Sequence, residues 1–117
     1  MARWRFRSNL FLLTHRPVTF ARLYRWPLAL LGVGAVLDGA TTFRFMVRLG
    51  VGEELHPAMR VASQILGPSL GVPLGTLAKV GFAIFVAALW RRWTGVLLCV
   101  CGLLYCAGAV WNHLVAG

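Results

Sequence analysis

Residues 28–47 read LALLGVGAVLDGATTFRFMV, an apolar stretch whose only acidic side chain is Asp38. A helix of about 20 such residues crosses the roughly 30 Å hydrocarbon core of a membrane. Two further stretches of similar length and composition follow at residues 70–90 and 93–114. The sequence therefore predicts an all-α fold, an integral membrane three-helix bundle whose spans lie close to these three ranges.

The composition supports a single membrane domain. Of the 117 residues, 59% are hydrophobic, and 12 lysines and arginines stand against 3 acidic residues, which gives a formal net charge of +9. Such a charge also occurs in nucleic-acid-binding proteins, but no polar domain remains here to carry that function. We therefore expect no nucleic-acid partner, an arm at residues 1–26 and a transmembrane domain at residues 27–117.

The arm mixes arginines with aromatic residues, a combination typical of segments that lie in the headgroup region of a membrane. It is predicted to be an interfacial arm that is partly helical and broken near Pro17. Its basic and aromatic side chains are the expected contacts with anionic lipid headgroups or with other membrane-protein subunits. These residues are Arg3, Trp4, Arg5, Arg7, Arg16, Arg22 and Arg25.

The arginines also predict the orientation, because basic residues accumulate on the cytoplasmic side of a membrane. Six arginines of the arm and two between the last two spans lie on one side, against three on the other. The N-terminus is therefore expected in the cytoplasm and the C-terminus outside, in a bacterial inner (cytoplasmic) membrane. Pro57 and Gly67 delimit a predicted short helix at about residues 57–66, which is expected to lie on the outer interface.

Two opposite charges lie inside the predicted spans. Asp38 follows Pro27 by 11 residues and Lys79 precedes Trp90 by 11, so each lies about 16 Å from the same side of the membrane. Antiparallel neighbouring spans bring the two side chains level, and an intramembrane ion pair is predicted. A structural pair that fixes the helix register is the favoured interpretation, and a proton or ion relay is the other.

Small residues line the predicted contact faces of the spans. Gly34 shares a face with Asp38 in the first span, and Gly71 and Gly75 share a face with Lys79 in the second. Close backbone approach at small residues is typical of membrane helices. The predicted helix-packing residues are Gly34, Gly71, Gly75, Gly95 and Gly102. Tyr105, near the depth of Asp38, is a further expected hydroxyl donor.

A second polar group is predicted on the outer side, where Glu54, His56 and His113 are expected to converge, with Glu53 and Asn112 nearby. Two histidines and a carboxylate form a metal-binding or proton-handling set. An interfacial hydrogen-bond cluster is the favoured interpretation, because polar residues are common at helix ends. We predict no metal and no cofactor. The sequence carries no P-loop and no plausible catalytic triad, and we predict that the protein is not an enzyme.

One series of residues resembles a known family. It consists of Asp38, Thr41 or Thr42, Gly52, the run Glu54-x-His56-Pro57, and Lys79. It is similar to an uncharacterised family of small bacterial and archaeal integral-membrane proteins. The resemblance implies three helices with an aspartate in the first span, a Glu-x-Asn-Pro motif after it and a lysine in the next. It covers residues 28–90, His56 replaces the asparagine, and it implies no particular activity.

These observations leave two main functional hypotheses. The first is a non-catalytic accessory or structural subunit that packs within a larger membrane protein complex. The alternative is an oligomeric ion- or proton-coupled transporter that uses the Asp38–Lys79 pair. An enzyme acting on a lipid or quinone at the outer polar group has the least support.

Overall fold

The computed structural model describes residues 9–53 and 57–116, and no strand occurs in either range. The helices, in chain order, are α1 (Leu10–His15), α2 (Pro17–Leu23), α3 (Arg25–Leu49), the 3-10 turn η1 (Val51–Glu53), α4 (Pro57–Leu66), α5 (Pro68–Leu89), the 3-10 turn η2 (Arg91–Trp93) and α6 (Thr94–Ala116). The predicted all-α three-helix bundle is confirmed.

Three helical segments are long and apolar enough to cross a membrane, namely Arg25–Leu49, Pro68–Leu89 and Arg91–Val115. Each extends slightly beyond one or both ends of the predicted span. The reason is that flanking residues such as Arg25 and Trp26 continue the helix although they are too polar or amphipathic to count as hydrocarbon-spanning. The chain is therefore a multi-pass membrane protein.

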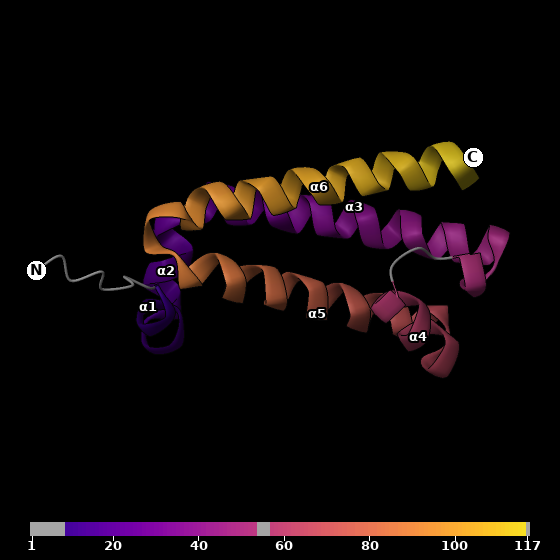
Figure 1. The fold of residues 1–117 in the computed structure, drawn as a ribbon, viewed down its shortest axis with the longest axis horizontal. Coiled ribbons are helices and arrows are strands. Elements are labelled where there is room, and N and C mark those ends of the chain that lie inside the picture. Colours follow the sequence, from indigo (N-terminus) through magenta and orange to yellow (C-terminus); the bar gives the residue numbers. More distant parts are fainter. Residues whose placement is uncertain (1–8, 54–56, 117) are drawn as a thin grey trace, which may run out of the picture.

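The three long helices lie side by side (Figure 1), and α3 packs most extensively against α6, which runs in the same direction. Glycines make this contact close. A Cβ atom added to Gly34 would lie 2.5 Å from the carbonyl oxygen of Gly102, and one added to Gly102 would lie 2.8 Å from Cγ of Leu30. The α3–α6 interface therefore depends on the absence of side chains at these two positions.

The helix α4 folds back along α5 (Figure 1), through a turn at Gly67 whose φ of +81° suits glycine. We expected Gly71 and Gly75 to bring the second span against the first. In the structure these two glycines face α4 instead. A Cβ atom added to Gly71 would meet Ser63 of α4, and one added to Gly75 would meet the sulfur of Met59 of α4. Part of α4 therefore lies against a span, and its opposite face carries the exposed Val61 and Ile65.

The arm is tied to the bundle at the end where α5 and α6 are joined. The backbone N–H of Asn9 donates to the carbonyl oxygen of Ala88 at 2.7 Å, and its side-chain amide donates to Thr94 Oγ1 at 2.9 Å. Phe20, only 2% exposed, packs in the main apolar core with Leu31, Ala83, Ala87, Ala88 and Leu98. The described part of the arm therefore contributes to the apolar core through Phe20, while most of its other side chains are exposed.

The close α3–α6 contact at Gly34 and Gly102 predicts a large difference in stability between two nearby alanine substitutions. Gly34→Ala places a Cβ atom against the Gly102 carbonyl, so we expect a loss of about 1–3 kcal/mol in the free energy of unfolding. The control is Gly32→Ala, where no heavy atom lies within 4 Å of the added carbon and no loss is expected. Denaturant titration in mixed micelles, followed by circular dichroism, measures both. Equal stability of the two variants would contradict the close α3–α6 contact.

Candidate functional site

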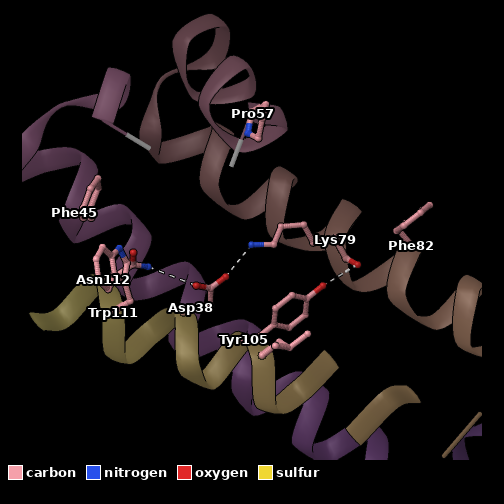
Figure 2. Close-up of a pocket in the computed structure, with 10 residues that line it drawn as sticks. Asp38, Phe45, Pro57, Lys79, Phe82, Tyr105, Trp111 and Asn112 are labelled. Carbon is pink, nitrogen blue, oxygen red and sulfur yellow. Dashed lines mark hydrogen bonds and ion pairs between the residues drawn. The ribbon is translucent and has the colours of Figure 1, made fainter. Parts of the chain in front are cut away.

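An ion pair lies in the middle of the bundle. Nζ of Lys79 on α5 donates to Oδ2 of Asp38 on α3 at 2.8 Å, as Figure 2 shows. The Lys79 side chain is 19% exposed and the Asp38 side chain is 12% exposed, so both are mostly buried within the bundle. The two residues meet because α3 and α5 run in opposite directions and each charge lies at a similar distance from the end at which α5 meets η2.

Asn112 on α6 extends this polar group. Its side-chain nitrogen Nδ2 lies 3.0 Å from Thr42 Oγ1, 3.2 Å from Thr41 Oγ1 and 3.5 Å from Asp38 Oδ1. An amide nitrogen has only two hydrogens to donate, so the longest of these contacts, to Asp38, is the weakest. Asn112 therefore links α6 to α3 next to the ion pair, through Thr41 and Thr42.

Asn112 was assigned by sequence reasoning to the outer polar group, away from the ion pair. The missed signal is helical spacing. Asn112 follows Tyr105 by seven residues, which places both on one face of α6. The structure brings both residues to the Asp38–Lys79 pair.

Tyr105 contacts Lys79 in two ways. Its hydroxyl donates to the backbone carbonyl oxygen of Lys79 at 3.1 Å, and the Lys79 ammonium lies 5.2 Å from the centre of its ring. The second distance is within the range of a cation–π interaction. Tyr105 thus holds the lysine from the α6 side, while Asp38 holds it from α3.

A cavity of about 540 Å³ opens beside the ion pair (Figure 2). Its polar lining is Asp38, Lys79 and Asn112, and the remainder of the lining is Phe45, Pro57, Phe82, Leu104, Tyr105, Gly108 and Trp111. Gly108 provides room for the carboxylate, since a Cβ atom there would lie 2.9 Å from Asp38 Oδ1. The ion pair therefore forms part of the wall of an open space and is not enclosed within a closed core.

Of the predicted outer polar group, the structure describes only His113 among the three residues expected to converge. His113 is exposed on α6, whereas its neighbour Asn112 is buried against α3. Glu54 and His56 lie outside the described residues, so their convergence with His113 stays a prediction. Within residues 9–53 and 57–116, no group of three or more histidine, cysteine, aspartate or glutamate residues is placed to hold a metal ion.

The structure describes three of the seven predicted lipid and partner contacts. Arg16, Arg22 and Arg25 are exposed, and the guanidinium of Arg25 lies 5.3 Å from the centre of the Trp26 ring. Arg3, Trp4, Arg5 and Arg7 lie outside the described residues. At Gly95, another of the predicted packing glycines, an added Cβ atom would meet Tyr24 and Pro27 at ordinary van der Waals distances.

The ion pair predicts that its two charges are coupled. Lys79→Met leaves the Asp38 carboxylate without its cation, and we expect a loss of about 3 kcal/mol in the free energy of unfolding. The double variant Asp38→Asn/Lys79→Met removes both charges and is expected to recover at least half of that loss. Unfolding by steric trapping in lipid bicelles measures all three proteins. Losses that add without any recovery would contradict the coupling.

Adjacent residues on α6 provide a second test. Asn112→Ala removes the hydrogen bonds to Thr41 and Thr42, so a loss of about 1–2 kcal/mol is expected. His113→Ala changes an exposed side chain and is expected to alter stability by less than about 0.5 kcal/mol. Both variants are compared with the parent protein in the same unfolding assay. The assignment of Asn112 to this polar group fails if the two substitutions have equal effects.

No protein-family model, curated protein or solved structure matches this chain. The family resemblance argued from the sequence therefore stays a prediction, and the function is inferred from the molecule's own geometry.

Proposed function

We propose that the protein is a non-catalytic accessory subunit that packs within a larger membrane protein complex. The observation that carries this proposal is an apolar groove between α3 and α5, with a volume of about 550 Å³. Its lining residues are Ala35, Val36, Gly39, Ala40, Phe43, Ser69, Val72, Pro73, Thr76 and Leu77. This groove is a surface on which a helix of another subunit can pack.

The groove suits a helix because small residues lie along it. Ala35 and Gly39 are buried and Ala40 is exposed, while α5 approaches so closely that a Cβ atom on Gly39 would lie 2.9 Å from Thr76 Oγ1. In a bilayer the hydrophobic effect does not drive helices together, because lipid tails are as apolar as leucine. Association instead depends on close packing, which small residues permit.

Much of the spanning surface is left for neighbours. In the most apolar parts of the second and third spans only 22% of the residues are buried within the protein. Val36 and Leu77, on the two sides of the groove, are each 68% exposed. These faces meet either lipid or protein, and the small-residue groove favours protein at that position.

The ion pair is consistent with a structural role. Asp38 and Lys79 neutralise each other and are held by Asn112 and Tyr105, so the polar group has internal partners and fixes three helices in register. An accessory subunit requires this kind of internal order but no reactive group.

The arginines support the proposed orientation and lipid contacts. Arg16, Arg22, Arg25, Arg91 and Arg92 are all exposed at the end of the bundle that carries the arm. Basic residues at a membrane surface attract anionic headgroups by about 1 kcal/mol each. We place this end on the cytoplasmic side of an inner membrane, with the C-terminus outside.

The groove can be blocked by one substitution. Ala40→Trp fills it with an indole ring, whereas Ala29→Trp adds the same ring at an exposed position of α3 that does not line the groove. Native membranes are extracted in polymer discs, and the mass and subunit composition of the particles are measured. We expect the parent protein and Ala29→Trp to travel with defined foreign subunits, and Ala40→Trp to lose them.

Two results would contradict the proposal. Unchanged association of Ala40→Trp would remove the groove as the contact. A particle that contains only copies of this chain would remove the accessory role and favour the oligomeric transporter instead.

A further inference from the structure

The cavity beside the ion pair has the properties of a small-molecule site. Its volume of about 540 Å³ lies within the roughly 300–1,000 Å³ typical of ligand pockets, and its wall is mostly apolar with a few polar groups. We propose that it binds a neutral, planar, carbonyl-bearing molecule dissolved in the bilayer interior, of the quinone class. The ring lies among the aromatic side chains, and a carbonyl oxygen accepts a hydrogen bond from Lys79.

Lys79 supplies the donor. An ammonium group carries three N–H donors, and within the part of the chain that the structure describes Lys79 Nζ donates one hydrogen bond, to Asp38. Its side chain is 19% exposed and lines the cavity, so further N–H donors are available to a ligand there. In a hydrocarbon environment a donor without an acceptor is costly, and a carbonyl oxygen removes that cost.

The ion pair sets the charge of the ligand. Lys79 Nζ and Asp38 Oδ2 are 2.8 Å apart, and the charges of the two side chains sum to zero. The cavity wall therefore carries no net charge from these residues. An ionised ligand brings a third charge into the middle of the membrane without a counterion, which is strongly unfavourable. A neutral molecule with a hydrogen-bond acceptor complements this wall.

The aromatic lining sets the shape. Tyr105, Phe45, Phe82 and Trp111 come from all three spans and line the same space. Aromatic rings prefer offset-stacked or edge-to-face contact with other planar rings, and such pairs add to the free energy of apolar burial. A flat ring therefore gains contacts here that a flexible alkyl chain does not.

The depth of the hydrogen-bonding groups at the inner end of the cavity separates a dissolved ligand from a phospholipid. Asp38 lies about 16 Å, eleven helical residues, from Pro27 near the start of its span. Ester carbonyls of phospholipids lie at the edges of a hydrocarbon core that is about 30 Å thick, far from this level. A lipid-soluble ring reaches it by lateral diffusion, because Leu104 and Phe82 on the cavity wall are 63% and 71% exposed.

This site is independent of the proposed subunit contact, because the cavity and the α3–α5 groove share no lining residue. The binding test uses the full chain in phospholipid discs, with empty discs to correct for partition into lipid. Three radiolabelled probes are compared: a decyl-substituted benzoquinone, decylbenzene, which lacks the carbonyl, and methyl laurate, which lacks the ring. We expect saturable one-to-one binding of the benzoquinone, and no saturable binding of decylbenzene or methyl laurate.

Substitutions test the position and the donor separately. Leu104→Trp fills the cavity without changing the ion pair, and Leu103→Trp adds the same ring at an exposed position that does not line it. We expect Leu104→Trp to weaken benzoquinone binding at least tenfold and Leu103→Trp to leave it unchanged. The double variant Asp38→Asn/Lys79→Met removes the donor without leaving an unpaired charge, and is also expected to weaken binding at least about tenfold.

Each other outcome overturns a defined part of the inference. Equal saturable binding of all three probes would make the cavity an unselective apolar space. Binding of methyl laurate as tight as that of the benzoquinone would assign the site to lipid esters. Unchanged binding by Leu104→Trp would place the ligand elsewhere, and unchanged binding by the double variant would remove Lys79 as the donor.

Discussion

The cost of a charge in hydrocarbon is the constraint on which this structure depends. A single ionised side chain at mid-membrane depth is unfavourable by roughly 3 kcal/mol on insertion scales. Asp38 and Lys79 each carry such a charge, and their hydrogen bond sets the register of α3 and α5. Tyr105 and Asn112 then attach α6 to the same point. One polar group thus contacts all three spans.

The bundle is constructed differently at its two ends. At the end that carries the arm, Asn9 and Phe20 lock α1 and α2 into a core of small and aliphatic residues, so α5 and α6 are held together. Beyond the ion pair α5 packs against α4 and, at Thr76, against Gly39 of α3, and the cavity lies between α5 and α6. The end that carries the arm is therefore closed by a packed core, whereas the half of the bundle beyond the ion pair holds the cavity with its polar and aromatic lining.

Local rules predicted much of this from the sequence. Hydropathy and length identify the spans, and the fixed rise of a helix places Asp38 and Lys79 at one level. The position of α4 was not predictable in this way, because it depends on a tertiary contact between Ser63 and Gly71 that has no sequence pattern of its own. Asn112 lies near the end of a span, which suggests the outer polar group, but its helical face turns it toward Asp38, Thr41 and Thr42. Burial of Phe20 likewise depends on which core lies beneath α2.

The separation of the two charges along the chain has a consequence for biogenesis. Asp38 and Lys79 are 41 residues apart, and α3 is synthesised before α5. During translation the first span therefore enters the bilayer with a carboxyl group that has no counterion until the second span follows. The apolar residues around Asp38 offset part of the cost of that step, because each leucine, isoleucine, phenylalanine or valine near the centre of a span contributes about −0.3 to −0.6 kcal/mol. The salt bridge can therefore form only after α5 has been synthesised and has met α3 in the bilayer.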